Sequence, residues 1–384
     1  MAETPRTADV VIAGGGVIGC SLAHHLAARG MSVVLCERES LGSQSTARCA
    51  GGVRQQFSSE LNVRMQRFSV ERLRHFEEEI GHPMEFRQTG YLFLLSTDEE
   101  VRTFRAQLDM WHRVGLREAR WVTPEEAQEL SPAITTDGLR GGTYCPTDGI
   151  ASSNDVTAGY ASAARREGAD LLEGVAVTGI DVQAGRVQAV HTSQGTIATP
   201  LVVDCAGAWS GEIGAMARIE LPVEPYPRHV FVTGPTSLVS RAAPLTIDFT
   251  TSFYFHPEGD GVLFGMGERD ERPSFRTDVD WSFLEKMEPV ARHRFPSLLD
   301  LGIQTAWVGL YETTPDHQPF LGPVAEVDGF WCACGFSGHG FQMAPAVGAL
   351  LSELLVDGRT WLDLGPFSPD RRGAGAWQPE ANVV

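Results

Sequence analysis

The start of the chain carries a glycine motif of the form G-x-G-x-x-G between two apolar runs. Residues 9–13 form a short apolar run, as expected of a strand buried on both faces of a parallel sheet, and the motif follows at residues 14–19. Residues 20–29 place their apolar side chains on one helical face, and residues 31–37 form a second apolar run that ends in an acid, Glu37. This order predicts a strand, a helix and a second, parallel strand.

Each glycine of the motif has its own task if the turn binds a dinucleotide. Gly14 permits the tight turn, Gly16 lets the backbone approach a pyrophosphate, and Gly19 lets the helix pack on the strand. The helix N-terminus then faces the negative charge. Glu37 is placed to bind a ribose 2′-hydroxyl, and an acid there disfavours the 2′-phosphate of NADP. The motif alone leaves NAD and FAD open.

A second glycine-rich element, at residues 335–340, lies much later in the chain, before a predicted helix that runs to about Val356. A flavin needs such an element, because reduction places negative charge at N1 and at the C2 carbonyl oxygen, which a helix N-terminus stabilises. The alternative is a strand-to-helix turn that needs glycine only for packing. The position of both elements favours FAD over NAD.

The composition limits the classes of molecule that the protein is expected to bind. The 384 residues contain 31 basic and 49 acidic side chains, a net charge of −18, and the only lysine is Lys286. A surface this acidic repels phosphate backbones and anionic lipids, so we expect no nucleic-acid partner. No apolar run approaches the roughly 20 residues of a membrane span.

The seven cysteines are odd in number, form no CxxC pair and follow no secretory segment. This usage predicts a reducing, cytoplasmic location. Cys332 and Cys334 resemble a metal pair, but no second pair exists to complete a zinc site, so we expect them to alternate along a buried strand. The sequence predicts no metal site.

The remaining pattern suggests two architectures in one chain. Alternating apolar and polar residues over 221–275 predict a half-exposed antiparallel sheet, unlike the opening unit. Within it Phe253, Tyr254 and Phe255 cannot share one face, and we expect Tyr254 to face the cofactor. Predicted helices are 58–80, 98–114, 124–130, 154–166 with Asn154 as cap, and 280–294; predicted strands include 86–95, 201–205 and 329–333.

The chain resembles the glycine oxidase and sarcosine oxidase group of the D-amino acid oxidase superfamily, which are FAD-dependent amine oxidoreductases. It is most similar to the beta subunits of sarcosine oxidase and proline dehydrogenase. The resemblance covers nearly the whole chain and rests on residues 10–19, 45–46, 51–56, 90–92, 203–209, 314–316 with Pro319, and 335–342 with Pro345.

The resemblance implies an α/β fold, with a Rossmann-like FAD-binding domain and a discontinuous substrate domain built on an antiparallel sheet. The FAD-binding domain would comprise residues 1–80, 145–220 and 305–364, and the substrate domain residues 81–144 and 221–304. Residues 365–384, rich in Gly, Pro and Ala, would form a loosely packed C-terminal tail.

The resemblance also implies where FAD binds. The residues that match the family's cofactor contacts are Gly14, Gly16, Val17, Ile18, Gly19, Glu37, Arg38, Ser45, Thr46, Ala50, Gly51, Gly52, Val175, Ala206, Gly207, Trp209, Gly338, His339, Gly340, Phe341 and Gln342. Members with covalent flavin attach it through a Cys or a His at places that here hold Gly309 and Ala47-Arg48. We therefore expect non-covalent FAD.

The implied catalytic residues are Arg54, Tyr254, His256, Tyr311 and His339. Arg54 would hold a substrate carboxylate. Sarcosine oxidases also place two lysines around the flavin, where this chain has Leu263 and Gln342. Because Lys286 lies in a predicted helix beside Glu285 and Glu288, we expect it on a solvated face. Fast reaction with oxygen would then need protonated His256 or His339, or an arginine.

Three functions are compatible with these features. The first is oxidation of an amine or amino acid, of the secondary, N-methyl or cyclic type, to an imine by hydride transfer to flavin N5. The second is oxidation of a 2-hydroxy acid, and the third is a flavin-holding subunit that needs a partner for electron transfer. The electron acceptor would be oxygen or another molecule, and a hetero- or homo-oligomer is expected. The missing lysines favour a dehydrogenase over an oxidase.

Overall fold

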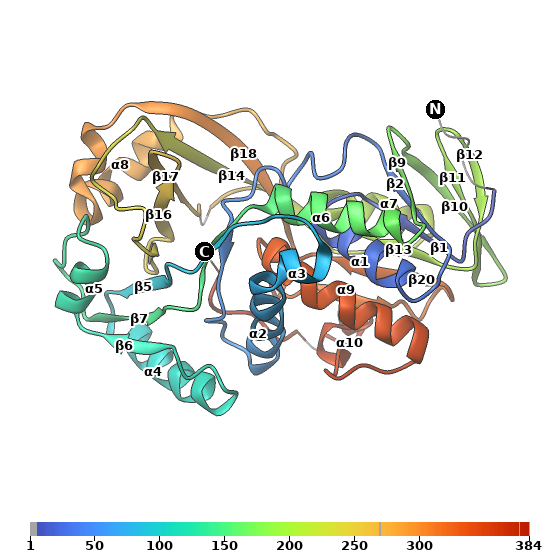
Figure 1. The fold of residues 1–384 in the computed structure, drawn as a ribbon, viewed down its shortest axis with the longest axis horizontal. Coiled ribbons are helices and arrows are strands. Elements are labelled where there is room, and N and C mark those ends of the chain that lie inside the picture. The colour runs from blue at the N-terminus through green and yellow to red at the C-terminus, as the bar shows by residue number, and fades with distance from the viewer. Residues whose placement is uncertain (1–5, 269, 376, 384) are drawn as a thin grey trace.

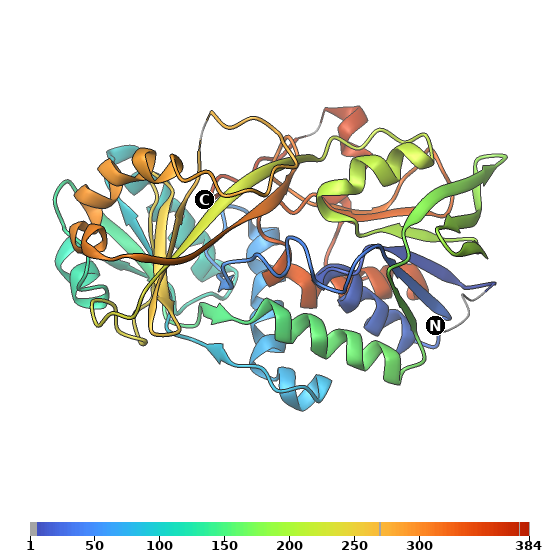
Figure 2. The same cartoon turned by 90° about the horizontal axis from the view of Figure 1, so that it is seen from above.

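Two large sheets, one mostly parallel and one mostly antiparallel, form the two halves of the molecule (Figures 1 and 2). The structure is a computed structural model that describes residues 6–268, 270–375 and 377–383. The chain passes between the halves several times, because each sheet takes strands from separate stretches of sequence. The α/β fold class expected from the sequence is confirmed.

The mostly parallel sheet has six strands in the order β19, β20, β13, β1, β2 and β9. Neighbouring strands are parallel, except that β19 runs antiparallel to β20. In chain order the strands are β1 (Val10–Ala13), β2 (Val33–Glu37), β9 (Asp170–Glu173), β13 (Val202–Asp204), β19 (Phe320–Pro323) and β20 (Phe330–Cys334). The strand–helix–strand unit predicted from the glycine motif is confirmed.

Both faces of β1 are buried, which explains its continuous apolar sequence. Val10 and Ile12 pack in one apolar cluster, whereas Val11 and Ala13 pack in another on the opposite face. The first face is covered by α1 (Val17–Ala27), α2 (Glu60–Arg74), α6 (Ser153–Arg166) and α9 (Gly340–Asp357). The second is covered by α7 (Ser210–Met216) and by a three-stranded antiparallel sheet of β10 (Val177–Gln183), β11 (Arg186–Thr192) and β12 (Gly195–Ala198).

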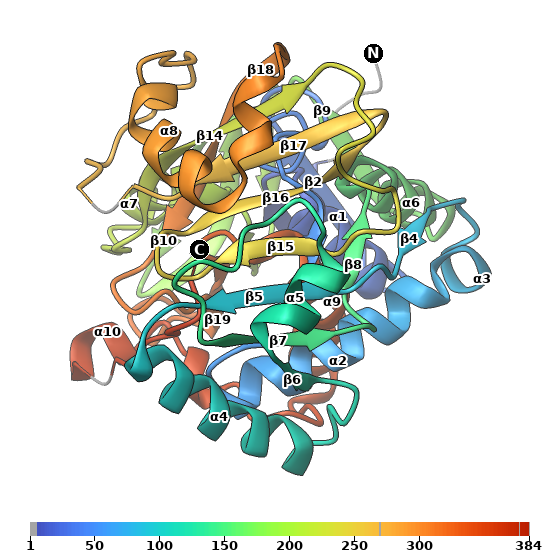
Figure 3. The ribbon, with the colours of Figure 1, turned by 90° about the vertical axis from the view of Figure 1, so that its left-hand side faces the viewer.

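The second large sheet has eight strands in the order β18, β14, β17, β16, β15, β5, β7 and β6 (Figure 3). Its strands are β5 (Tyr91–Leu95), β6 (Arg120–Val122), β7 (Gly141–Cys145), β14 (Glu224–Thr233), β15 (Leu245–Asp248), β16 (Phe253–Glu258), β17 (Gly261–Met266) and β18 (Ile303–Thr313). Only β5 and β15 pair in parallel, so the expected antiparallel sheet is mixed at one pair. Strand β18 continues through the expected domain boundary at residues 304–305.

Shorter elements connect the halves and cover the sheets. Helices α4 (Asp98–Arg113), α5 (Pro124–Leu130) and α8 (Phe283–Arg294) lie on the side of the eight-stranded sheet (Figures 1 and 3). A small sheet, β3–β8–β4, lies between the halves. The remaining elements are β3 (Gly52–Val53), α3 (Phe76–Ile80), β4 (Phe86–Arg87), β8 (Gly149–Ala151), α10 (Arg371–Ala374) and the 3-10 turns Gly207–Trp209, Pro296–Asp300 and Gly365–Phe367.

The predicted helices are mostly confirmed, with differences at their ends. The helix expected over 58–80 is interrupted at His75, which separates α2 from α3. The expected cap Asn154 is wrong, because the Ser152 side chain accepts the N–H of Asp155 at 3.2 Å and begins α6 one residue earlier. The strand expected over 86–95 is broken at Gly90, whose φ is +91°.

The prediction of a loosely packed tail is wrong for the part of residues 365–384 that the structure describes. Arg371 is buried and forms an ion pair with the buried Asp316, with 3.0 Å between Nε and Oδ2. Further along, Glu380 and Asn382 are 2% and 0% exposed. The tail is therefore attached to the packed interior at several buried side chains, held by polar contacts that its composition did not indicate.

The cysteines are all unpaired thiols, and Cys332 and Cys334 are buried on β20 as predicted. The described residues contain no cluster of His, Cys, Asp or Glu able to hold a metal ion. Among the same residues, no helix combines the length and apolarity that crossing a membrane requires.

One buried acid at the end of β13, Asp204, makes the stability of the folded state depend on pH. Asp204 is fully buried, its Oδ1 accepts the N–H of Ala206 at 2.9 Å and the hydroxyl of Ser210 at 3.0 Å, and its Oδ2 has no hydrogen-bond partner among the described residues. Burial raises the pKa of Asp204 from 3.8 to about 7. The folded state therefore holds more protons than the unfolded state between these values, and stability from this group is lost as pH rises toward 7.

We predict that Asp204→Asn weakens the pH dependence of stability. The wild-type urea midpoint should fall as pH rises from about 5 to 7.5, and the variant should fall less, because an amide has no proton to lose. Asp328→Asn is the control, since Asp328 is exposed and pairs with Arg186. Parallel curves for wild type and Asp204→Asn would show that Asp204 is ionised in the folded protein.

Candidate active site

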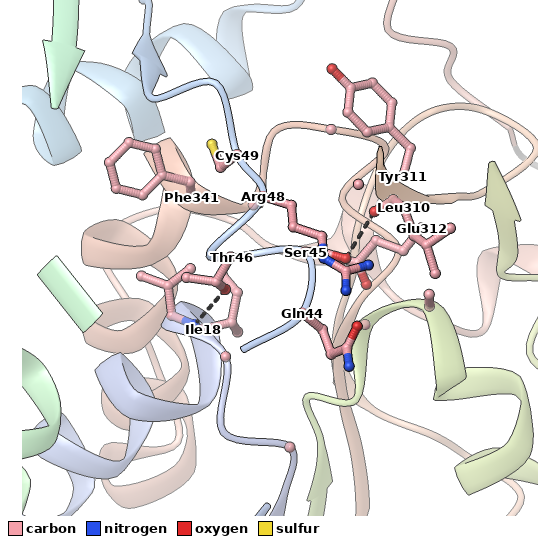
Figure 4. A pocket seen from close by; sticks show the side chains of 18 of the residues that line it. Ile18, Gln44, Ser45, Thr46, Arg48, Cys49, Leu310, Tyr311, Glu312 and Phe341 are labelled. Carbon is pink, nitrogen blue, oxygen red and sulfur yellow. Dashed lines mark hydrogen bonds between the residues drawn. The ribbon is translucent and has the colours of Figure 1, made fainter. Parts of the chain in front are cut away.

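A cavity lies where the glycine turn, the N-terminus of α9 and the eight-stranded sheet meet. Its walls come from β1 and the start of α1, from residues 36–54, from residues 205–216, from strands β5, β14, β15, β16 and β18 of the sheet and from residues 338–342. Figure 4 shows part of this wall, with Ser45 and Thr46 between α1 and β18. The cavity therefore joins the two halves of the molecule.

The three motif glycines are needed for the reasons that the sequence suggested. Gly14 has φ +111°, and a Cβ on it would lie 2.4 Å from the carbonyl oxygen of Cys205. A Cβ on Gly19 would lie 2.0 Å from the carbonyl oxygen of Gly14, so helix and strand can approach only at glycine. Gly16 lines the cavity itself. The first and third glycines thus serve packing, and the second keeps the cavity open.

Acidic and aromatic side chains lie at the β2 end of the cavity. Glu37 accepts the N–H of Gly15 at 2.7 Å and that of Glu39 at 2.8 Å. The Arg38 guanidinium lies 4.0 Å from the ring centre of Trp209, and Phe275 stacks on Trp209 at 5.4 Å. Glu37, Arg38 and Trp209 all line the cavity. This end presents a carboxylate and a flat aromatic surface, which suit a ribose and an adenine.

Residues 45–49 connect the glycine turn to β18. The Thr46 hydroxyl accepts the N–H of Val17 at 3.1 Å, and the Ser45 hydroxyl donates to the carbonyl of Leu310 at 2.9 Å (Figure 4). A Cβ on Gly309 would lie 3.3 Å from the carbonyl oxygen of Arg48, so the two segments are in contact. Burial raises the pKa of the nearby Cys49 thiol to about 11, which keeps it neutral.

The second glycine element brings a helix N-terminus to the cavity. Residues 338–342 line it, and they include the first turn of α9. Gly338 has φ +92°, and a Cβ there would lie 2.4 Å from the ring of Tyr311. The N–H groups of a first helical turn have no helical partner, and the helix dipole favours negative charge there. This arrangement is what a reduced flavin requires.

Arg54 is a buried cation at the cavity wall. Its side chain is buried, and its guanidinium donates to the carbonyl of Gln56 at 2.8 Å, to Nε2 of His339 at 3.1 Å and to the carbonyl of Asn382. The guanidinium also lies 4.0 Å from the ring centre of Phe57. No carboxylate of the described residues is within ion-pair distance of it. Burial lowers the pKa of Arg54, but a guanidinium stays charged in proteins.

His339 is neutral at this site. A guanidinium can only donate, so Nε2 of His339 must accept from Arg54 and the ring proton must sit on Nδ1. Burial and the neighbouring Arg54 charge lower the pKa of His339 well below its ordinary value. These contacts disfavour a protonated His339 as the cation that fast reaction with oxygen would need.

Three tyrosines and a further arginine, Arg228, complete the wall. Tyr91, Tyr254 and Tyr311 line the cavity, and burial raises the pKa of each phenol, so all three remain protonated. The Arg228 guanidinium lies 4.9 Å from the ring centre of Tyr311 and pairs with Glu271. Unlike Arg54, Arg228 thus has a carboxylate partner.

The structure places most of the expected residues along the cavity, and four of them elsewhere. Tyr254 faces the cavity, whereas its neighbours Phe253 and Phe255 pack in the core. Among the expected residues, those that do not line the cavity are Gly19, Gly51, Val175 and His256. The backbone N–H of Val175 donates to the backbone carbonyl of Glu37 at 2.8 Å.

His256 is fully buried behind the cavity. Its Nδ1 lies 3.0 Å from the carbonyl of Pro257, and its Nε2 lies 2.9 Å from the carbonyl of Ala50. Burial lowers the pKa of His256. Both ring nitrogens face carbonyl oxygens, and a neutral imidazole has one N–H to donate, so the ring contacts the backbone at Ala50, a cavity residue, from behind the cavity wall.

Sequence reasoning missed several lining side chains, among them Arg48, Cys49, Tyr91, Arg228 and Glu312. Tyr91 was available from the segment 90–92, which carries part of the family resemblance. Arg228 lies in an alternating strand, where only the pairing with β18 shows which face it occupies. Lys286 is exposed and pairs with Glu268 rather than with Glu285 or Glu288, so the one lysine does not line the cavity.

Comparisons with known proteins agree with this geometry. The family profile described as FAD dependent oxidoreductase (DAO) matches residues 9–354. The chain therefore belongs to the DAO family of FAD-dependent oxidoreductases. Its FAD site fits the residues present, since a glycine cradle, a carboxylate and a helix N-terminus line one cavity.

Individual relatives are similar over most of this chain. Sarcosine dehydrogenase, mitochondrial, from Mus musculus is 32% identical over 94% of the chain, which spans 41% of that protein. FAD-dependent oxidoreductase domain-containing protein 1 from Xenopus laevis is 31% identical over 99% of the chain and 85% of that protein. Among solved structures, L-proline dehydrogenase from P. horikoshii has 36% identity and a TM-score of 0.91, covering 98% of this chain and all of that one. The chain thus spans less than half of the mitochondrial relative.

We predict that Gly16→Val abolishes most FAD binding while leaving the fold intact. Gly16 has ordinary backbone geometry, and its Cβ would meet only the Thr46 hydroxyl at 3.2 Å, so the side chain would project into the cavity. Loss of two charge-assisted hydrogen bonds to the pyrophosphate, each worth about 1.5 kcal/mol, lowers affinity about a hundredfold. FAD titration of the apoprotein measures this, with thermal unfolding as a check of the fold. Gly302→Val is the control, because a Cβ on Gly302 meets nothing within 4 Å and its backbone is outside the left-handed region; equal FAD affinity in both variants would contradict the assignment.

Proposed function

We propose that the protein oxidises the C–N bond of an amino acid, of the secondary or cyclic type, to an imine with FAD. The observation that carries this proposal is the buried Arg54 guanidinium at the cavity wall, with no carboxylate partner among the described residues. A buried charge is stable only when it is paired, and a substrate carboxylate would supply the partner. The names of similar proteins, which include sarcosine, dimethylglycine and L-proline dehydrogenases, support this substrate class.

The proposed roles of the residues follow from their protonation. Arg54 holds the substrate carboxylate, and neutral His339 accepts one of its N–H groups without competing for the anion. The phenols of Tyr254 and Tyr311 remain protonated, so they present hydrogen-bond donors and no negative charge to the carboxylate. The cavity thus holds the substrate by its carboxylate. The side chains that we place near the amine, the two phenols, carry no charge.

The chemistry needs little from the protein beyond this placement. Bound FAD supplies the acceptor for a hydride from the carbon next to the nitrogen. The residues of the cavity hold the amine in its neutral form, orient that carbon and exclude water until the imine is released for hydrolysis. Because Gly309 stands where a cysteine would form a covalent link, we propose that the cofactor is bound non-covalently.

We further propose that the enzyme is a dehydrogenase rather than a fast oxidase. Its one lysine is outside the cavity, His339 is neutral, and the Arg228 charge is paired with Glu271. Arg48, which also lines the cavity, donates to the carbonyl of Val308 at 3.2 Å, so the cavity offers arginines but no lysine to stabilise reduced oxygen. The seven unpaired thiols, six of them buried, support the expected reducing, cytoplasmic environment.

We predict that substrate bleaches the yellow FAD spectrum under anaerobic conditions. The panel comprises N-methylglycine, L-proline, glycine and L-lactate, and at least one of the first two should bleach the flavin fully. Slow recovery of colour on admitting air, with little peroxide, is expected of a dehydrogenase. Bleaching by L-lactate alone would favour the 2-hydroxy acid alternative, and no bleaching by any member would favour a passive flavin-holding subunit.

We predict that Arg54→Gln raises the KM for the amino-acid substrate about a hundredfold. The expected loss is that of paired, charge-assisted hydrogen bonds to a carboxylate, each worth about 1.5 kcal/mol. Steady-state kinetics with an artificial acceptor measures this, with FAD content confirming a loaded enzyme. Arg140→Gln serves as the control, because Arg140 is exposed and pairs with Asp98. An unchanged KM in Arg54→Gln would exclude Arg54 as the carboxylate ligand.

A further inference from the structure

The C-terminal segment 377–383 reaches the cavity wall from the far side of Arg54. The carbonyl oxygen of Asn382 accepts an N–H from the Arg54 guanidinium. The side-chain amide of Asn382 donates to the carbonyl of Gln56 at 3.2 Å, the same carbonyl that accepts from Arg54 at 2.8 Å. Asn382 thus contacts Arg54 directly and through a shared acceptor.

Asn382 is itself fixed from two sides. Its side chain exchanges two hydrogen bonds with Gln107 on α4, of 2.8 and 3.1 Å. Its backbone N–H donates to Glu380 at 3.0 Å. Asn382 is fully buried and Gln107 is 8% exposed, so these bonds are shielded from water.

Glu380 connects the same segment to α2. Its carboxylate accepts the N–H of Ser58 at 2.7 Å and the side-chain amide of Asn62 at 2.7 Å, in addition to the N–H of Asn382. Its own N–H donates to the carbonyl of Asp316 at 2.9 Å. The segment therefore links α2, α4 and residue 316 behind one guanidinium.

The hydrogen bonds leave part of Arg54 available. Hydrogen bonds to described residues use three of the five N–H groups of its guanidinium. A long, flexible arginine loses substantial side-chain entropy when it is ordered, so a ligand that binds a prefixed guanidinium does so at lower cost. A support shell of this kind is what a precise carboxylate site needs.

We propose that Asn382 and Glu380 are positioning residues of the substrate site, and that the C-terminal segment orients Arg54 toward the carboxylate of the substrate. This inference rests on the proposed function, in which Arg54 binds that carboxylate. It assigns the tail a role in substrate affinity alongside the second glycine element, whose His339 also contacts the Arg54 guanidinium. The rival possibility is that the tail occupies Arg54 and competes with the substrate.

We predict that Asn382→Ala raises the KM for the bleaching substrate about tenfold, with kcat changed less than threefold, because one orienting hydrogen-bond set is lost. The test uses the FAD-loaded full chain and the amino acid that bleaches the wild-type flavin. Gln107→Ala should raise KM in the same direction, since it removes the anchor of Asn382 and leaves Asn382 in place. Gln378→Ala is the matched control, because Gln378 lies in the same segment with its side chain exposed.

The double variant separates positioning from general destabilisation. In the Arg54→Gln background, Asn382→Ala should have no further effect on KM, because it acts through Arg54. Additive effects would show a merely structural role and overturn the inference, and a lower KM in Asn382→Ala would show that the tail competes with the substrate. If wild type bleaches but Arg54→Gln keeps the wild-type KM, the proposed function of Arg54 fails first and independently of the tail.

Discussion

The rest of the site depends on one positive charge buried between the two halves of the molecule. Arg54 follows the short strand β3 and contacts the second glycine element through His339, while its own N–H donates to the side chain of Gln342 at 2.7 Å. A buried guanidinium demands acceptors, and the chain supplies neutral ones, two carbonyls and an imidazole. Because no carboxylate neutralises it locally, the charge remains available to a ligand, and the protonation of every neighbour is constrained by it.

Glycine makes close backbone packing possible within the half that holds the mostly parallel sheet. At Gly14 and Gly19 the absence of a side chain allows β1, α1 and the segment after β13 to approach one another. The buried pair of Asp316 and Arg371 then fixes the tail beside the end of β18. A buried pair is weak evidence for net stability, but it specifies one arrangement, since misplacing the tail would leave a charge unpaired. Both contacts therefore act on the geometry of the cavity more than on the total free energy of folding.

The sequence was informative where the pattern is local and less so where contacts are long-range. The alternation of side chains along a strand placed Tyr254 and Phe255 on opposite faces of the sheet. The spacing of the glycines located the turn between β1 and α1. Each of these patterns depends on a few adjacent residues. The packing of Asn382 against Arg54 joins residues 328 positions apart, and no local pattern encodes it. His256 was assigned to the site from its strand, yet pairing with Leu263 and contact with Ala50 place it behind the wall. Side-chain direction at such positions is decided by tertiary packing.

The scarcity of lysine determines which kind of cation lines the cavity. A lysine is a compact point charge that can be brought close to a flavin, whereas the arginines here are occupied by carbonyls, a histidine or a carboxylate. Arg54 is oriented by its partners toward anion binding, and Arg228 is compensated by Glu271. In the function that we propose, positive charge in this cavity holds a substrate carboxylate and does not activate oxygen.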